Sequence, residues 1–166
     1  MYSVRPLAIP DADAFVVLRR AMLADTPWAF ASSPEIDRGC KPELVRDSVT
    51  RDGSAILGAF DGDALIGAAG LVRDDKPKRR HIATIWGVYV APSARRVGLG
   101  RRIVESAIAL ARTWTGVECL QLTVSEKAVA AQRLYESLGF STWGYEPDAL
   151  RVDGRSCNET HMRLVF

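Results

Sequence analysis

The chain has 166 residues, of which 48% are hydrophobic and 25% are charged, and its formal net charge at pH 7 is +2. This length fits one domain with a real apolar core, and the composition is ordinary for a globular protein. So small a net charge argues neither for nor against a nucleic-acid partner.

The sequence also argues against several stabilising and targeting devices. The chain has three cysteines, Cys40, Cys119 and Cys157, and no two of them are close in the sequence. An odd number without a close pair provides neither a disulfide framework nor the spacing of a zinc site. No apolar segment follows a basic start, and no apolar stretch is long enough to span a bilayer. We therefore expect a cytoplasmic protein without a signal peptide or a membrane partner.

The first half of the chain predicts a strand, two helices and a two-stranded hairpin. Apolar residues at helical or strand spacing place these elements, in order, at residues 3–7, 11–24, 42–50, 55–60 and 64–72. Asp61-Gly62 lies between the last two apolar runs, which is a good hairpin signal. A structured loop is expected at residues 27–34.

The second half predicts alternating strands and helices that close the sheet. We expect strands at residues 81–90, 119–124, 140–145 and 159–166, and helices over residues 103–111 and 128–138. Gly139 stands where a left-handed helix end belongs. The element order predicts a mixed sheet with helices on its faces.

The connection between the strand at 81–90 and the following helix is rich in glycine and arginine. It reads Arg95-Arg96-Val97-Gly98-Leu99-Gly100-Arg101-Arg102. A helix N-terminus presents unpaired N–H groups and a partial positive charge, and glycines allow a ligand to approach the backbone closely. This turn therefore predicts an anion site that would suit a diphosphate.

Two common nucleotide-binding patterns do not match this turn. A P-loop needs Lys-Ser or Lys-Thr after its last glycine, and neither follows here. A dinucleotide-binding fingerprint needs a third glycine at the position where this chain has Ile103. Both common nucleotide folds are thus disfavoured.

The turn matches the [RQ]-x-x-G-x-[GA] signature of the Gcn5-related N-acetyltransferase (GNAT) family. Residues 131–140 resemble that family's A-x-x-L-Y-x-x-x-G-F helix end, and residues 88–92 and 122–124 resemble its neighbouring strands. The resemblance implies an α/β (α+β) fold with a mixed, mostly antiparallel sheet of about six or seven strands, flanked by about four helices. It also implies a splayed parallel strand pair and a single N-acetyltransferase domain over residues 1–166.

By this resemblance the protein transfers an acetyl group from its cosubstrate acetyl-CoA to a primary amine of a small molecule or peptide, by direct attack. The pantetheine arm would enter the gap between the strands at 81–90 and 119–124, beside a bulge at Gly87. The cofactor-binding residues that the resemblance implies are Val88, Tyr89, Val90, Arg95, Arg96, Val97, Gly98, Leu99, Gly100, Arg101, Gln132 and Tyr135.

The resemblance assigns the chemistry to two groups. The N–H of Val88 would polarise the thioester carbonyl, an interaction worth about 3 kcal/mol per donor in well-studied hydrolases. Tyr135 would act as the general acid that protonates the departing thiolate. The substrate-binding residues expected for the acceptor amine are Trp28, Phe30, Glu35 and Trp86.

The chain departs from the family pattern at two places. Many relatives have a glutamate base on the strand before the glycine turn, but residues 84–86 contain no acid. Glu35 and Glu146, on loops expected near the substrate, are the substitutes that we consider. Ala128 replaces an asparagine that often opens the last helix, so one common cofactor contact is missing.

Two other classes of function stay open. The missing glutamate and asparagine would also suit a catalytically weak CoA-binding sensor or interaction domain. The basic runs at 76–81 and 95–102 would suit a nucleic-acid-binding module, which is the weaker alternative because an acidic pair offsets the first run. His81 and His161 lack metal-ligand partners at suitable spacing, so we expect no metal. The resemblance also allows a homodimer.

Overall fold

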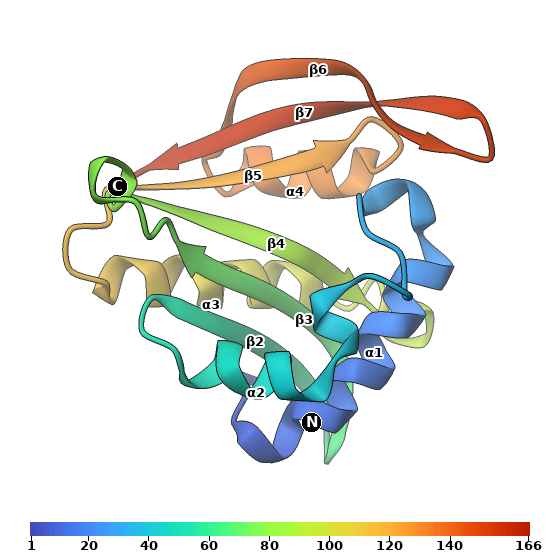
Figure 1. The fold of residues 1–166 in the computed structure, drawn as a ribbon, viewed down its shortest axis with the longest axis vertical. Helices are drawn as coiled ribbons and strands as arrows, with labels where there is room; N and C mark the ends of the chain where they lie inside the picture. Colours follow the sequence, from blue (N-terminus) through green and yellow to red (C-terminus); the bar gives the residue numbers. More distant parts are fainter.

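A seven-stranded sheet in the order β1-β2-β3-β4-β5-β7-β6 runs through the molecule (Figure 1). The computed structural model describes residues 1–166, and only β4 and β5 pair in parallel. This is the mixed, mostly antiparallel sheet that the sequence predicts. The strands are β1 (Tyr2–Pro6), β2 (Ser54–Asp61), β3 (Ala64–Arg73), β4 (Ile82–Val90), β5 (Cys119–Ser125), β6 (Ser141–Val152) and β7 (Arg155–Val165).

Helices cover both faces of this sheet. They are α1 (Ala12–Asp25), α2 (Pro42–Thr50), α3 (Leu99–Thr113) and α4 (Val129–Ser137), close to the predicted ranges. Phe15 and Val45 anchor α1 and α2 on one face, whereas Ile103 and Tyr135 anchor α3 and α4 in the core of the other face. None of these helices combines the length and the apolar character needed to cross a bilayer.

The apolar stripe of α3 explains why this helix packs where it does. Ile103, Val104, Ala107 and Ala111 repeat at helical spacing and are all fully buried against the sheet. Burial of apolar surface is worth about 25 cal/mol per Å², so this stripe fixes the helix firmly. The start of α3 is thereby held at the C-terminal end of β4.

The parallel strands β4 and β5 separate soon after they begin. Their pairing consists of Ile82 with Cys119, Ala83 with Leu120, and Thr84 with Gln121. Both strands continue for several residues beyond this point, and Figure 1 shows them diverging. The splayed pair is therefore confirmed.

A bulge in β4 lies where the strands diverge. Ala68 of β3 pairs with Tyr89 and Gly70 pairs with Trp86, so Gly87 and Val88 together face one residue of β3. Gly87 has φ of 62°, in the left-handed region that favours glycine. The bulge predicted at Gly87 is confirmed, and it changes the direction of the strand at the edge of the gap.

The last two strands are longer than the sequence predicts. They reach Val152 and begin again at Arg155, joined by the two-residue turn Asp153-Gly154. The outer half of this hairpin is mostly polar and exposed, and its register shifts between Glu146 and Leu150. It therefore lacks the alternation of apolar residues that marks a strand in a sequence.

Candidate active site

A small cavity of about 80 Å³ lies between the diverging ends of β4 and β5. Trp86 and Val88 line it from β4, Thr123 from β5, Tyr135 from α4, and Phe30 from the loop after α1. The structure thus brings together four residues that the sequence assigns to the site from distant parts of the chain. Thr123 is a member of the cavity that the sequence did not indicate.

Tyr135 lines this cavity from α4. Its side chain is 5% exposed and packs edge-on against Phe140, with the ring centres 5.9 Å apart. The Tyr135 hydroxyl makes no hydrogen bond within the protein. Every fully buried side-chain oxygen of the protein does make one, so the Tyr135 hydroxyl is not fully buried and keeps access to the cavity that the residue lines. Burial raises the pKa of Tyr135, which keeps the phenol protonated as a proton donor.

The glycine turn offers a row of free backbone donors. Arg96 and Gly98 have φ of 66° and 82°, and α3 begins at Leu99, whose side chain is buried. The amides of residues 96–101 donate no hydrogen bond within the protein. Successive N–H groups in such a turn, at the positive end of a helix, form an anion-binding concavity.

Arg95 braces this turn against α1. Its guanidinium pairs with Asp25 and donates to the Val90 carbonyl at 2.9 Å. The hydrogen bond from Arg95 is the largest cause of the lowered pKa of Asp25, which also accepts from the Tyr89 hydroxyl at 3.2 Å. The Tyr89 side chain therefore points to the α1 face of the sheet, and at Tyr89 the backbone is what a cofactor can meet.

The other predicted side chains near the turn differ in whether hydrogen bonds within the protein already occupy them. Arg101 donates to Ser137 at 2.6 Å and to Glu105 at 3.3 Å, which ties α3 to α4. Gln132 donates to Glu136 at 3.1 Å on the surface of α4. Arg96 is exposed and makes no ion pair or side-chain hydrogen bond, so its charge is available to an anion.

Two predicted acceptor-side residues lie outside both main cavities. Trp28 is half-buried in a short turn after α1, and Glu35 is exposed on the next loop. A hydrogen bond with Ser33 is the main cause of the lowered pKa of Glu35. Their roles stay predictions.

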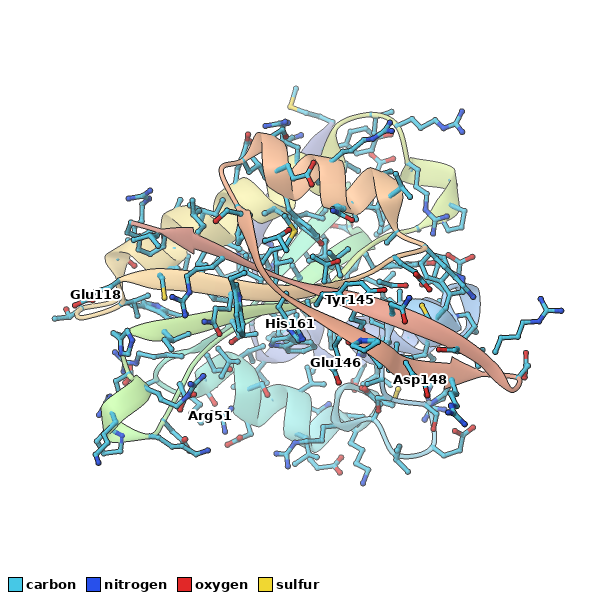
Figure 2. All side chains as sticks on the ribbon, turned by 90° about the horizontal axis from the view of Figure 1, so that it is seen from above. Arg51, Glu118, Tyr145, Glu146, Asp148 and His161 are labelled. Atoms are coloured by element: carbon cyan, nitrogen blue, oxygen red, sulfur yellow. The ribbon has the colours of Figure 1, made fainter.

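A chain of hydrogen bonds links Glu146 to the small cavity. His161 Nε2 lies 3.0 Å from Glu146 Oε2, and His161 Nδ1 lies 3.1 Å from Thr123 Oγ1. Figure 2 shows His161 and Glu146 side by side. The sequence did not reveal this contact because His161 is 38 residues from Thr123 and 15 from Glu146. The sheet alone makes them neighbours, by pairing β7 with both β5 and β6.

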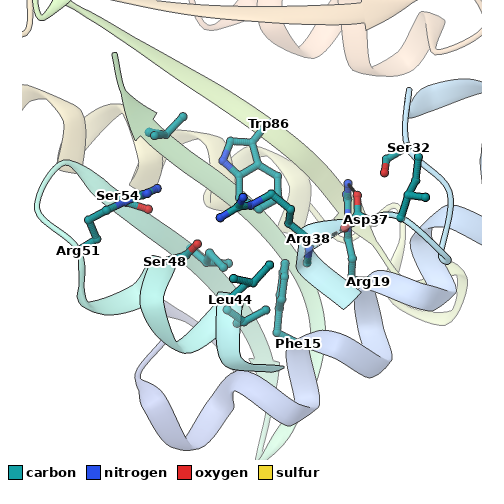
Figure 3. Close-up of a pocket in the computed structure, with 15 residues that line it drawn as sticks. Phe15, Arg19, Ser32, Asp37, Arg38, Leu44, Ser48, Arg51, Ser54 and Trp86 are labelled. Carbon is teal, nitrogen blue, oxygen red and sulfur yellow. Dashed lines mark hydrogen bonds and ion pairs between the residues drawn. The ribbon is translucent and has the colours of Figure 1, made fainter. Parts of the chain in front are cut away.

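A larger cavity of about 370 Å³ lies against α1, α2 and β2, and Trp86 forms part of the wall of both cavities (Figure 3). A buried ion pair lines the larger cavity. Arg19 holds Asp37 through two hydrogen bonds, Nε to Oδ1 at 3.1 Å and Nη2 to Oδ2 at 2.8 Å. Arg19 also lies over the rings of Phe30 and Trp86, at 5.0 and 5.6 Å from their centres.

The charge state of this pair follows from its surroundings. Burial alone would raise the pKa of Asp37, but the hydrogen bonds and charge of Arg19 outweigh that effect and the pKa is lowered. The pair is therefore fully ionised at neutral pH. The guanidinium of this pair packs against Phe30 and Trp86, a contact that no pattern in the sequence indicated.

Comparison with known proteins places these features in a family. Residues 18–140 match the model of the acetyltransferase (GNAT) family. Mycothiol acetyltransferase from Salinispora tropica is 32% identical over 126 residues, which cover 74% of this chain and 41% of that protein. The chain thus spans about two fifths of the length of this curated relative.

Solved structures share the whole fold. The acetyltransferase of GNAT family from Streptococcus pneumoniae superposes with a TM-score of 0.88, covering 100% of both chains at 22% identity. Spermidine N-acetyltransferase from Vibrio cholerae, solved in complex with CoA and spermine, has a TM-score of 0.80 at 19% identity, covering 99% of this chain and 95% of its own. The free amides, the splayed strands and the family match agree, and the chain belongs to the GNAT family of acetyltransferases.

Proposed function

We propose that this protein is an N-acetyltransferase that moves the acetyl group of acetyl-CoA to a primary amine of a small molecule or peptide. The observation that carries the proposal is the row of free amides at residues 96–101, at the mouth of a gap between splayed strands. A diphosphate linker would accept hydrogen bonds from these amides, with Arg96 adding charge. The Vibrio cholerae relative, solved with CoA, supports the choice of ligand.

The small cavity would then hold the thioester. The N–H of Val88, beside the bulge, would donate to the thioester carbonyl oxygen and stabilise the negative charge that develops there. The amine nitrogen attacks the carbonyl carbon, a C–N bond forms, and the C–S bond breaks. Tyr135 gives its proton to the departing thiolate, so that the products are the acetylated amine and CoA.

The attacking amine must also lose a proton. A lysine-like amine has a pKa of about 10.4, so most of it is ammonium at neutral pH and cannot attack. We propose that His161 Nδ1 accepts this proton through the Thr123 hydroxyl, which takes a proton from the amine, directly or through water, as it gives its own to the imidazole. Glu146 would stabilise the charged imidazole through its contact with Nε2. This arrangement supplies a base where the strand before the glycine turn has none.

The variant Gly98→Glu tests the cofactor site. The new carboxylate would lie among the free amides and repel a diphosphate, and we expect calorimetry to show CoA binding abolished. The fold should survive, because a Cβ at Gly98 meets no atom within 4 Å and the left-handed φ costs about 1–2 kcal/mol.

Gly116→Glu is the matched control. Gly116 has nearly the same φ, +80° against +82°, and equally open surroundings, but it follows the far end of α3. Unchanged CoA affinity in Gly98→Glu would refute the site. Tight CoA binding without transfer to any amine of a broad panel would favour the sensor alternative.

A further inference from the structure

The larger cavity has more positive than negative groups on its walls. Arg19, Arg38 and Arg51 line it, and Asp37 is the single acid among the lining residues. Arg19 and Asp37 neutralise each other in their buried pair. A molecule in this cavity therefore meets two further arginines and no carboxylate that is free to receive an ammonium group.

Both of these arginines are available to a ligand. The one hydrogen bond that involves Arg38 is made by its backbone carbonyl, which accepts from Lys41 N–H at 3.2 Å. Arg51 approaches Asp47 only at 3.9 Å, with both side chains about half exposed. Figure 3 shows Arg38 near the middle of the cavity and Arg51 toward one end, near Ser54. Free guanidiniums at a cavity favour carboxylate or phosphate groups, which they bind through paired hydrogen bonds.

The remaining walls fit a small molecule with an apolar part. Phe15 and Trp86 meet edge-on with ring centres 6.5 Å apart, and Leu44 and Ile56 add aliphatic surface. The volume of about 370 Å³ is that of a small-molecule site.

This cavity adjoins the proposed reaction centre. Trp86 belongs to both cavities and directly precedes the bulge. Arg19, which lines the larger cavity, lies next to the bulge. Its Nη1 atom is 3.1 Å from the position that a Cβ on Gly87 would take. The larger cavity thus lies next to the part of β4 that carries Val88.

We propose that the acceptor is a small amine that also carries a carboxylate or a similar anionic group. Arg38 and Arg51 hold the anion, and the apolar part of the acceptor packs on Trp86 and Leu44, which are partly exposed in the cavity. The inference rests on the acetyl transfer proposed above and specifies its acceptor. Amino acids with apolar side chains have this chemistry, whereas polyamines do not, because the two arginines repel a second positive charge.

The test compares amines that differ only in charge. Phenylalanine, methionine and leucine are each assayed for acetylation beside their amides, with spermidine as a polycation. We expect kcat/KM to be at least about 10-fold higher for the acids than for the amides. A factor of this size corresponds to the loss of one hydrogen bond between a ligand and a charged side chain. The amides have the larger fraction of free amine, so amine basicity cannot produce this preference.

Variants locate the effect. Arg38→Gln and Arg51→Gln should each lower kcat/KM for the best acid about 10- to 100-fold and change the value for its amide little. Arg20→Gln is the matched control, because Arg20 is an exposed arginine of α1 that lines neither cavity. It should leave the preference for acids unchanged.

Calorimetry without acetyl-CoA separates this inference from the proposed function. Binding of the acid that is lost in Arg38→Gln, in a protein that acetylates no amine, would leave the anion site standing while acetyl transfer fails. Acetylation of the amides or spermidine as efficient as that of the acids would overturn the inference. So would an equal effect of Arg38→Gln on acids and amides, or the absence of both binding and acetylation for all three acids.

Discussion

The Tyr135 phenol and the Asp37 carboxyl show how the surroundings of a buried group set its protonation state. Burial raises the pKa of Tyr135, since water no longer stabilises the phenolate. The Asp37 carboxylate is also buried, but the nearby guanidinium lowers its pKa instead. One residue is thereby kept as an acid and the other as an anion.

Tyr135→Phe should lower kcat by about 100-fold or more, because the variant removes the proposed general acid. CoA affinity should stay close to that of the wild type, since phenylalanine preserves the packing on Phe140. Steady-state rates and calorimetry measure the two effects. Because the pKa of Tyr135 is raised, its deprotonation should cause no loss of wild-type rate up to about pH 10, the ordinary tyrosine value.

Tyr145→Phe is the control for this experiment. Tyr145 is 60% exposed on β6, outside both cavities, and its hydroxyl should not matter for the rate. An unaltered turnover number in Tyr135→Phe would remove Tyr135 from the mechanism.

Asp37→Asn should lower the free energy of unfolding at pH 7 by about 3–5 kcal/mol, because it leaves the buried Arg19 charge unpaired. The folded pKa of Asp37 is lowered, so its contribution is fully present above the unfolded value of about 4 and is lost as the pH falls through the folded value. Denaturant unfolding at several pH values should show the gap between variant and wild type narrowing below about pH 4.

Asp63→Asn, in the exposed turn between β2 and β3, is the matched control and should cost little at any pH. A gap between Asp37→Asn and wild type that stays constant down to pH about 2 would contradict the assigned ionisation.

The strand ends are the elements that build the site. β4 and β5 stop pairing after Thr84 and Gln121, and the bulge at Gly87 directs β4 away from its neighbour. The gap that results is lined by side chains from both strands and by α4. On the other side of β5, close pairing with β7 brings His161 directly opposite Thr123.

His161→Gln tests the proton path across β5, β7 and β6. We expect kcat at neutral pH to fall about 100-fold, the ordinary contribution of a general base. The deficit should shrink at alkaline pH, where more of the acceptor amine arrives without its extra proton. A pH–rate profile measures both effects.

His81→Gln is the matched control, because His81 is exposed before the start of β4, at the opposite end from the gap. If His161→Gln and His81→Gln have the same rate at every pH, the path through His161 is wrong.

The whole molecule rests on one sheet that serves two cores. The α1–α2 face and the α3–α4 face share the strands β2, β3 and β4, so neither core can open without exposing the other. The hairpin of β6 and β7 lies beyond residues 18–140, which match the family model, yet β7 pairs with the full length of β5. The homodimer that the resemblance allows stays a prediction.

Residues 1–166 should therefore unfold as one domain. We expect a single calorimetric transition whose calorimetric and van't Hoff enthalpies agree. Two separated transitions, or a calorimetric enthalpy well above the van't Hoff value, would show that the hairpin or one core unfolds independently.

The sequence by itself determined most of the elements, the mixed sheet and the glycine turn, because these depend on local patterns of apolar residues and glycine. The bulge at Gly87 was implied only by the family resemblance. The sequence missed the outer half of the last hairpin, although Asp153-Gly154 carries the same turn signal as Asp61-Gly62. The residues that flank Asp153-Gly154 are mostly polar, because the outer half of this hairpin buries little apolar surface. An alternating apolar pattern records burial rather than backbone pairing.

Only the tertiary structure decided which charged groups meet. Arg19 with Asp37, and His161 with Thr123 and Glu146, join residues from different elements. Arg38, which precedes α2 in the chain, and Arg51, which follows it, line the same cavity. Pairing of this kind depends on strand register and helix docking, which no short stretch of sequence encodes. The cavity that the proposed acceptor would occupy therefore forms only when the chain is folded.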